Sequence, residues 1–454
     1  MCAIAGGFSV STAEMIALLE HRGGDGRGTF ARDELGLAHL LHATHSREAQ
    51  PLAGERLVLV ANGEIYNHRE LRDKLPQNFR TGSDCEAILR LVENHYRGDL
   101  LRAVVEALPE LDGEFAFAVS DGCTIVLARD PLGTKPLYHT SHAFASERKA
   151  LPGGREASCL PPEEVLCLSP RGISNRRIER LGLRRVRSPE EELSDAIVEA
   201  VRKRAEHVER FGVLFSGGID SALVAWVCAV LGHAPRLYAV AMPGSLDWRR
   251  LRKGRFMDME IVLREVTPGE LEEAVDRVLY AIEEPSLLKL SIALPVYLTA
   301  QQARREGEKV LLTGQGSDEL FAGYARYSAL GSGLEKALRR DVEALHCTNL
   351  ERDDKAAMAA QVELLHPYLD RRVVEVALSL PNNLKIRGGV RKYILRRVAE
   401  RLGLSREVAM REKKAVQYST GVMKALKKLA RRQGMKPGEY VEERFRRLMS
   451  ASSA

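Results

Sequence analysis

A glycine-broken stretch near the middle of the chain carries residue types that suit phosphate chemistry. It reads Leu214-Phe215-Ser216-Gly217-Gly218-Ile219-Asp220-Ser221. An apolar run, 211–215, opens it, and an apolar helical pattern follows it. A strand, a glycine turn and a helix start direct several backbone N–H groups and the positive end of the helix dipole at one point. The alternative, an ordinary capped turn, is disfavoured by this strand–loop–helix context.

A second stretch of the same kind follows the apolar run 309–313 and reads Thr313-Gly314-Gln315-Gly316-Ser317-Asp318. Asp220 and Asp318, at two strand ends, could share one Mg²⁺, which prefers carboxylate oxygens. Neither loop continues as Gly-Lys-Ser/Thr, so a Walker-type lysine is absent. As an alternative, both acids could simply cap helices.

The second residue of the chain is a cysteine at the start of an expected strand. Removal of Met1 would give Cys2 a free α-amino group, with a pKa near about 8, beside its own thiol. Such an amine can act as general base without a histidine partner. The other interpretation is a small buried hydrophobic residue.

Short motifs in the first part of the chain resemble the class II glutamine amidotransferase domain, an N-terminal-nucleophile hydrolase with an αββα sandwich. They include His21-Arg22-Gly23-Gly24-Asp25, Asn62-Gly63-Glu64-Ile65-Tyr66-Asn67-His68, Thr81-Gly82-Ser83-Asp84-Cys85-Glu86 and Phe144-Ala145-Ser146-Glu147. The resemblance implies that Cys2 attacks the side-chain amide of glutamine and releases ammonia. It assigns the oxyanion hole to the Asn62 side chain and the Gly63 N–H, and the substrate ammonium to Glu64 and Asp84.

One position departs from that family. The arginine that binds the carboxylate of glutamine falls on Leu41, within Ala38-His39-Leu40-Leu41-His42. Two interpretations remain open: either the nearby Arg47 takes over this role, or the site binds glutamine weakly.

The loop 214–221 resembles that of the ATP pyrophosphatases, which bind the pyrophosphate of ATP and cleave between the α- and β-phosphates. With the amidotransferase half, the two loops resemble the glutamine-hydrolysing asparagine synthetase family, and the match extends to Pro367-Tyr368-Leu369-Asp370 and Arg391-Lys392-Tyr393. This implies a doubly wound parallel sheet with extra C-terminal helices. It also implies nucleotide contacts by the loop 214–221, Val240, Thr313 and Gly314, and a late lysine, Lys413 or Lys414, facing the adenylate.

The function implied by the resemblance is amidation of aspartate to asparagine through a β-aspartyl-adenylate. The substrates would be glutamine, aspartate and ATP, with Mg²⁺, and the products would include AMP, pyrophosphate and glutamate. Two departures concern the acceptor: Gln315 stands where the family has a glutamate, and Leu365-His366 where it has an arginine.

These departures keep rival functions open. An amidotransferase, or an amide-forming cyclase of the β-lactam synthetase type, could act on a different carboxylate, although Cys2 argues against the cyclase. The missing arginine prompts a third possibility, a glutamine- or nucleotide-sensing protein without turnover. A tRNA-modifying ATP pyrophosphatase is disfavoured by the amidotransferase half and by the lack of paired cysteines.

The chain must supply two scaffolds for these residues, and its length of 454 residues allows two globular domains. We place an amidotransferase domain at 1–170, a linker at 171–192 and a synthetase domain at 193–454. In the second half, strands are expected at 211–215, 237–242, 260–266 and 309–313, and helices at 270–282 and 292–305. The tail after Gly421 should form a basic amphipathic helix followed by disorder.

Composition narrows the expected partners and location. The net charge is only +6, and the basic clusters carry no interleaved aromatic residues, so no nucleic acid is expected. The longest apolar run, 222–231, is about half of what a bilayer requires, so no membrane is expected. The seven cysteines form no Cys-x-x-Cys pair, which argues against zinc. Their odd number, without a secretion signal, predicts a cytoplasmic protein. A homodimer is the assembly considered.

Overall fold

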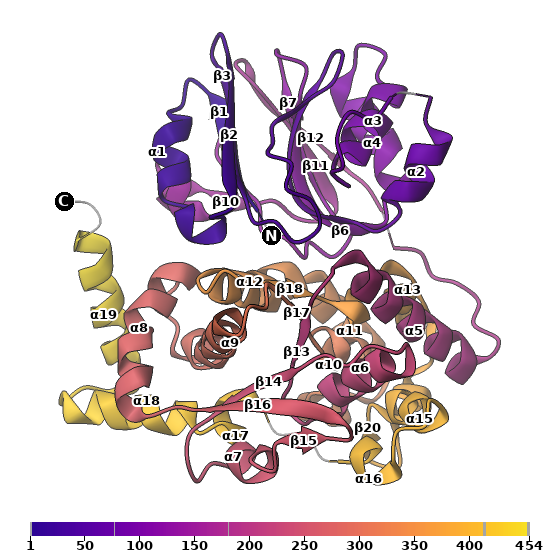
Figure 1. Ribbon diagram of the computed structural model, residues 1–454, viewed down its shortest axis with the longest axis vertical. Helices are drawn as coiled ribbons and strands as arrows, with labels where there is room; N and C mark the ends of the chain where they lie inside the picture. Colours follow the sequence, from indigo (N-terminus) through magenta and orange to yellow (C-terminus); the bar gives the residue numbers. More distant parts are fainter. Residues whose placement is uncertain (1, 77, 180, 412–414, 452–454) are drawn as a thin grey trace. The chain divides into compact units, whose positions relative to one another are not determined.

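The computed structural model describes residues 2–76, 78–179, 181–411 and 415–451 (Figure 1). The chain divides into two compact units. The first comprises Met1–Gly182 and Glu343–Glu351, and the second comprises Leu183–Val342 and Arg352–Ala454. The first division point lies inside the residues expected to form a linker.

The first unit contains two antiparallel six-stranded sheets. One has the order β10 (Ser158–Cys159), β8 (Tyr138–His139), β9 (Ala143–Ala145), β1 (Ala3–Phe8), β3 (Leu35–Leu41), β2 (Gly26–Arg32). The other has the order β12 (Gly172–Arg177), β11 (Glu164–Ser169), β7 (Ile125–Arg129), β6 (Gly113–Ser120), β5 (Val58–Ile65), β4 (Leu52–Ala53). Strand β12 thus occupies residues that were expected to be linker.

The alternating direction of side chains along the strands explains how each sheet packs on both of its faces. Successive side chains face opposite sides of a sheet, so an apolar strand buries both of its faces. Ile4 and Val60 belong to the core between the sheets. Ala3 and Ala5 pack instead with α1 (Thr12–Ala17), and Leu59 packs with α3 (Glu86–His95) and α4 (Leu100–Ala107). The expected αββα sandwich is confirmed.

The second unit is built on a six-stranded sheet. Its order is β15 (Arg255–Phe256), β16 (Met259–Glu265), β14 (Leu237–Ala241), β13 (Gly212–Leu214), β17 (Val310–Leu312), β18 (Glu363–Leu365). All neighbouring pairs from β16 to β18 are parallel, and only β15 is antiparallel. The chain runs outward from β13 to β16 and then returns to β17 on the other side. The sheet is therefore doubly wound, as expected, and its strand order reverses between β13 and β17.

Helices cover both faces of this sheet. Helices α8 (Pro268–Ile282) and α9 (Leu287–Arg305) lie over one face, and α6 (Ile219–Val230) lies over the other, next to α5 (Pro189–His207) (Figure 1). The remaining helices of the unit are α7 (Leu246–Leu251), α10 (Ser317–Leu320), α11 (Leu334–Glu343), α12 (Glu351–Met358), α13 (Arg371–Ser379), α14 (Asn382–Lys385), α15 (Tyr393–Arg401), α16 (Arg406–Ala409), α17 (Val416–Ser419), α18 (Val422–Arg432) and α19 (Pro437–Ala451).

The expectation of a disordered tail is wrong for the residues that the structure describes. After the basic helix α18, the chain forms a second helix, α19. Tyr440 and Val441 of this helix are almost fully buried in the same core as Leu279 of α8. Phe445 and Leu448 of the same helix are partly buried against this core, so an apolar stripe holds the helix in place.

A short segment of the second half of the chain belongs to the first unit. Glu343–Glu351 includes a π-helical turn, His346–Leu350. His346 Nδ1 lies 3.7 Å from Cys159 Sγ, to which Arg129 Nη1 donates a hydrogen bond at 3.5 Å. This segment is therefore a structural part of the amino-terminal sandwich.

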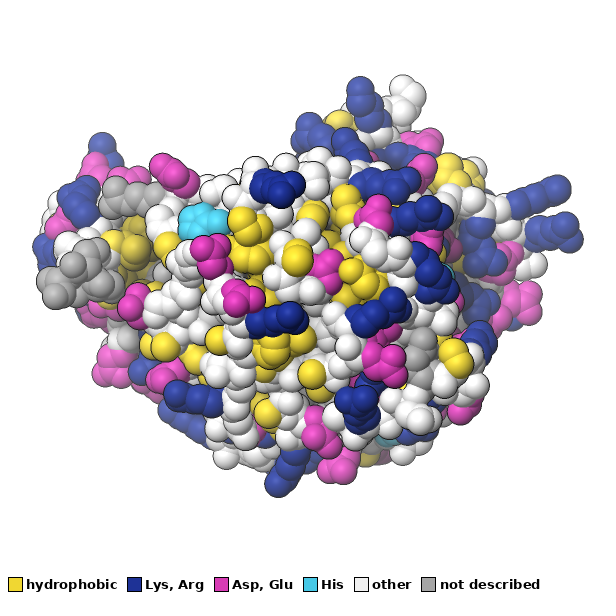
Figure 2. All heavy atoms as spheres, turned by 90° about the horizontal axis from the view of Figure 1, so that it is seen from above, with side chains coloured by type: hydrophobic (Ala, Val, Ile, Leu, Met, Phe, Trp, Pro, Cys, Tyr) yellow, Lys and Arg dark blue, Asp and Glu magenta, His cyan; other side chains and the backbone are white. Residues whose placement is uncertain are grey.

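On the face of the protein shown in Figure 2, Asp and Glu side chains lie among the Lys and Arg side chains. Among the described residues, no helix combines the length and the apolar character that a membrane span requires.

Candidate active sites

Cys2 lies directly before strand β1, which runs between β3 and β9 in the first sheet. Its backbone N–H donates to Asn62 Oδ1 at 2.9 Å, and this bond joins it to strand β5 of the facing sheet. Cys2 is 9% exposed and lines a pocket. The thiol that the sequence predicts as a nucleophile is thus held on rigid strands at a surface opening.

Asn62 and Gly63 are consecutive residues of β5 beside Cys2. Because Asn62 Oδ1 accepts the bond from Cys2, Nδ2 points elsewhere, and this buried donor has no hydrogen-bond partner in the described structure. Buried polar atoms are rarely left in this state, so the orphaned N–H group indicates a ligand. At Gly63 a Cβ would lie 2.4 Å from Glu114 O, so only glycine fits there. The pair is suited to bind an oxyanion.

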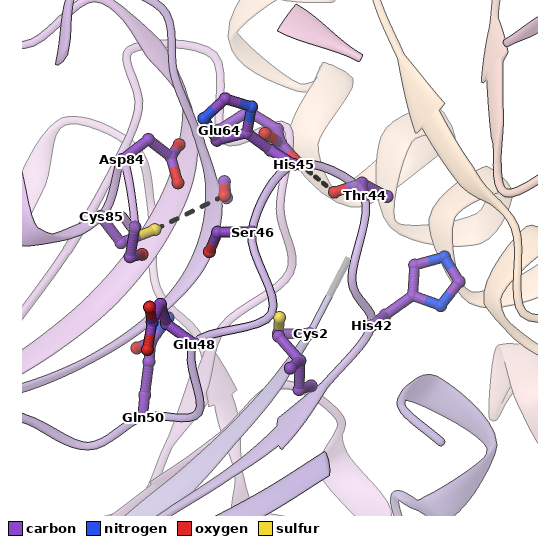
Figure 3. Close-up of a pocket in the computed structure, with 13 residues that line it drawn as sticks. Cys2, His42, Thr44, His45, Ser46, Glu48, Gln50, Glu64, Asp84 and Cys85 are labelled. Atoms are coloured by element: carbon purple, nitrogen blue, oxygen red, sulfur yellow. Dashed lines mark hydrogen bonds between the residues drawn. The ribbon is translucent and has the colours of Figure 1, made fainter. Parts of the chain in front are cut away.

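The pocket beside Cys2 is walled on one side by six residues of one segment, His42, Thr44, His45, Ser46, Glu48 and Gln50 (Figure 3). It contains about 340 Å³ of empty space, part of it open to solvent. Glu64 and Asp84 both line it. Asp84 Oδ2 accepts from the Ile65 N–H at 2.6 Å, and Glu64 Oε1 accepts from Thr44 Oγ1 at 2.6 Å. Both carboxylates are therefore held in fixed positions on the pocket wall.

A second cysteine lines the same pocket but differs from Cys2 in its chemistry. Cys85 Sγ donates to Gly63 O at 3.6 Å (Figure 3). Burial raises the pKa of the Cys85 thiol well above its usual range, and neighbouring Asp84 raises it further. Cys85 therefore remains a neutral thiol and does not compete as nucleophile.

The arginine that could replace the missing one does not reach the pocket. Arg47 is exposed and is not among the residues of the pocket wall, although Ser46 and Glu48 on either side of it are. Leu41 is buried and lines the pocket. This geometry supports the interpretation in which glutamine lacks its usual cationic partner.

A buried ion cluster behind Cys2 was missed by the sequence reasoning. Arg22 Nε donates to Cys2 O at 3.5 Å, and Arg22 Nη1 donates to Glu147 at 2.7 Å. His21 and Lys149 contact the same carboxylate at 3.0 Å and 2.6 Å. Burial opposes ionisation of Glu147, but the cations, His21 and Lys149 before Arg22, hold its pKa well below the usual range. The His-Arg-Gly-Gly-Asp and Phe-Ala-Ser-Glu motifs were the available signal, because each supplies members of the cluster.

In the second unit, the loop after β13 forms the amino end of α6, as the sequence predicts. Gly217 has a φ of 69°, a conformation that favours glycine. Ser216 N donates to Ser221 Oγ at 3.1 Å, and the two hydroxyl oxygens lie 3.2 Å apart. The other residues that the sequence assigns to ATP here are Leu214, Phe215, Gly218 and Asp220, with Val240 on β14.

The loop after β17 packs directly against the first loop. A Cβ on Gly314 would lie 2.8 Å from Asp220 Cβ and 3.0 Å from Ser221 N, so glycine alone allows this approach. Thr313 Oγ1 accepts from the Gln315 N–H at 3.1 Å. The two loops meet where the strand order reverses, which is the usual ligand crevice of such sheets.

Asp220 and Asp318 converge, as expected, but on a lysine that the sequence reasoning did not single out. Lys392 Nζ lies 2.5 Å from Asp220 Oδ1, 2.7 Å from Asp318 Oδ1 and 3.0 Å from Ser317 Oγ. Lys392 is 2% exposed. Gly323 leaves room for it, since a Cβ there would lie 2.2 Å from Lys392 Cε. In the sequence, Lys392 stands out only as part of a family match, because no local pattern shows that it reaches these loops.

Lys413 and Lys414, the lysines expected to face the adenylate, lie outside the described residues. Arg411, the last described residue before them, donates from Nη1 to Gly217 O at 3.2 Å. Arg411 is thus a further cation at the first loop.

Comparison with known proteins finds a different family model for each half of the chain. A model of the glutamine amidotransferase domain matches residues 1–162, and an asparagine synthase model matches residues 192–333 and 331–451. The chain is 34% identical to putative glutamine-hydrolyzing asparagine synthetase 1 of Methanocaldococcus jannaschii, over 96% of each protein. It is 32% identical to asparagine synthetase B of Escherichia coli K12, over 93% of this chain and 82% of that one. A solved structure of Bacillus subtilis glutamine phosphoribosylpyrophosphate amidotransferase aligns with 69% of this chain and 81% of its own, at 18% identity and a TM-score of 0.36.

Proposed function

Because the chain belongs to the family of glutamine-hydrolyzing asparagine synthetases, we propose that it amidates aspartate to asparagine with ammonia from glutamine. ATP activates the aspartate side chain as a β-aspartyl-adenylate, and AMP, pyrophosphate and glutamate are released. The observation that carries this proposal is the presence, in one chain, of an amino-terminal cysteine pocket and two glycine loops at a strand-order reversal. The first supplies ammonia and the second supplies the activated acceptor.

In the glutaminase half, the Cys2 thiol attacks the side-chain amide of glutamine. Once Met1 is removed, the α-amine of Cys2 takes the thiol proton and passes it to the leaving ammonia. Asn62 Nδ2 and the Gly63 N–H stabilise the oxyanion that forms, which is supported by the buried, unpartnered state of Nδ2. Glu64 and Asp84 accept hydrogen bonds from the ammonium of the substrate.

In the synthetase half, the loops 214–221 and 313–318 bind the triphosphate of ATP through backbone N–H groups and hydroxyls. The adenine is expected near the backbone of Val240. Lys392 stabilises the negative charge of the departing pyrophosphate, which is supported by its burial between the two loops. Lys413 or Lys414 would face the adenylate.

The carboxylates of this half fit Mg²⁺. Asp220 and Asp318 are 6% and 9% exposed, and both contact the same Lys392 Nζ, so the two carboxylates lie close together. Hard oxygen ligands of this kind suit the ion. Asp220 and Asp318 would hold Mg²⁺, which supplies positive charge beside the phosphate oxygens.

A second candidate function changes only the acceptor. Gln315 and Leu365 stand where the resembled family has a glutamate and an arginine. Another carboxylate could therefore be amidated by the same chemistry. The cytoplasm as location and a homodimer as assembly also remain proposals.

Mass spectrometry of the products separates these candidates. The full chain is incubated with ATP, Mg²⁺, glutamine and, one at a time, a panel of carboxylic acids that includes aspartate. Asparagine, AMP and pyrophosphate in equal amounts are expected from aspartate. If another acid is amidated and aspartate is not, the second candidate is correct.

A further inference from the structure

The glutamine pocket is lined by acids without a strong cation. Besides the thiols of Cys2 and Cys85, its titratable wall residues are Glu48, Glu64, Asp84, His42 and His45. Within the described part of the chain, the wall contains no arginine and no lysine. The wall therefore presents three carboxyl groups and two imidazole rings.

The two histidines are placed poorly for recognising a carboxylate. His42 Nδ1 lies 3.9 Å from Asp25 Oδ2, and its ring points away from Cys2 in Figure 3. The His45 ring packs edge-on against His68, with ring centroids 5.3 Å apart. Neither imidazole offers the two parallel N–H donors with which a guanidinium binds a carboxylate.

Free glutamine carries two charges at its α-carbon, and this wall suits only one of them. The α-ammonium finds the fixed carboxylates of Glu64 and Asp84. The α-carboxylate would face like charges, and the position of the family's arginine is filled by the apolar Leu41. Like charges in a partly buried site disfavour binding.

We propose that this pocket selects glutamine donors whose α-carboxyl group is uncharged, and that Leu41 sets this preference. The substrate class is a glutamine α-amide or a glutamine at the amino terminus of a peptide. This inference rests on the proposed glutaminase role of the first unit. Part of the pocket is open to solvent, so a donor larger than glutamine is not excluded by a closed cavity.

The reaction on such a donor is the same as on glutamine. The Cys2 thiol adds to the side-chain amide, the C–N bond breaks, and ammonia leaves with the proton taken from the thiol. Water then hydrolyses the thioester, which regenerates the thiol and yields a glutamate whose α-carboxyl group is still an amide. Atoms and electrons balance without any co-reactant other than water.

The test compares L-glutamine, L-glutaminamide and L-glutaminylglycine as donors for the full-length protein, with kcat/KM for ammonia release as the measurement. Mass spectrometry confirms that the side-chain amide, and not the α-amide, is lost. We expect kcat/KM to be at least as high for the two donors whose glutamine α-carboxyl group is part of an amide as for glutamine. In Leu41→Arg the ratio should shift toward glutamine by roughly ten- to a hundredfold, the range for a guanidinium–carboxylate pair.

Two matched variants exclude trivial effects. Leu41→Met keeps the side chain apolar and of similar volume, so the wild-type order of donors should remain. Arg47→Ala removes an exposed cation outside the pocket wall, so kcat/KM should be unchanged for all three donors. A strong loss of glutamine use in Arg47→Ala would overturn the inference.

A wild-type preference for glutamine of about tenfold or more would overturn the inference but leave the glutaminase function intact. Absence of ammonia release from every donor, with ammonium-dependent synthesis still active, would instead contradict the proposed glutaminase. Ionic strength gives a readout that needs no variant. Screening should raise the KM for the cationic glutaminamide more than the KM for zwitterionic glutamine, and equal responses would argue against the charge-based account.

Discussion

At the scale of single residues, the three groups Asp220, Asp318 and Lys392 carry the most chemistry in the second unit. Each carboxylate contacts the same buried ammonium. With two acids and one ammonium, the cluster has a formal charge of −1, so loss of the lysine would leave two like charges together in a buried place. The cluster is therefore a place where charge, rather than shape, should decide activity.

We predict that Asp220→Asn and Asp318→Asn each lose at least about a hundredfold in aspartate-dependent pyrophosphate formation, since the side-chain size is kept and the charge is lost. Asp258→Asn, at an exposed acid of the same unit, is the control and should keep wild-type rates. AMP and pyrophosphate are the expected products. Stoichiometric ADP and phosphate would contradict the assignment of both loops.

His39 is a second residue whose charge state has a measurable effect. Burial lowers the pKa of His39 to about 3, and neither ring nitrogen has a hydrogen-bond partner in the described structure. The unfolded chain binds a proton below about pH 6.5, whereas the folded chain does not. Stability from this residue is therefore complete above pH 6.5 and is lost as the pH falls toward 3.

For His39 we predict that the free energy of unfolding falls by about 1 kcal/mol between pH 6.5 and 5.5. This part of the pH dependence should be missing in His39→Gln. Urea unfolding of the full chain, followed at several pH values for both proteins, measures the difference. The same pH dependence in both would show that His39 is not the group responsible.

At the scale of helices and strands, the glycines of the two ATP loops determine how closely β17 approaches α6. At Gly314 the neighbouring atoms are the Cβ and backbone of Asp220 and the backbone of Ser221, which cannot rotate away. A methyl group there must push the two loops apart. Even a small displacement of aligned groups is costly for a reaction that depends on their position.

We predict that Gly314→Ala reduces synthetase activity by at least about a hundredfold and leaves ammonia release from glutamine unchanged. In Gly269→Ala, the control in α8, the added Cβ meets nothing closer than 4.0 Å, so activity should stay at the wild-type level. Initial rates of both half-reactions, measured on each variant, check the prediction. Wild-type synthesis by Gly314→Ala would contradict the close packing of the loops.

The sequence predicted the regular elements of the second unit well, because apolar runs and glycine turns are local signals. The strand expected at 237–242 is Leu237–Ala241, and the helix expected at 270–282 is Pro268–Ile282. The sequence was a poor guide to elements whose formation depends on contacts with distant parts of the chain. Helix α19 packs on the core through Tyr440 and Val441, with Phe445 and Leu448 partly buried beside them, and no composition rule shows that these residues have a partner in α8.

The candidate sites show the same division. Gly63, Glu64 and Asp84 line the pocket of Cys2, and Asn62 is hydrogen-bonded to it, while the roles that the motifs assign to them stay predictions. Lys392 was missed because a lysine that follows an arginine is typical of a solvated surface, and only folding brings it between two distant loops. Lys413 and Lys414 stay a prediction.

At the scale of the whole molecule, the two halves should be separable in activity, since each unit has its own core and its own site. We predict that Cys2→Ala abolishes asparagine formation from glutamine but preserves formation from added ammonium salts. Product formation with each nitrogen source is the measurement. Loss of both activities in a folded protein would show that the thiol is needed beyond the first unit.

The placement of Glu343–Glu351 has a consequence for how the protein is made. A ribosome releases the first 182 residues long before this segment, so the amino-terminal sandwich must wait for its last piece while most of the second sheet is being synthesised. Order of synthesis and order of completion thus differ in this chain. A premature stop codon before Glu343 would leave Cys159 without the His346 ring that packs beside it, so the change would reach both units of the protein.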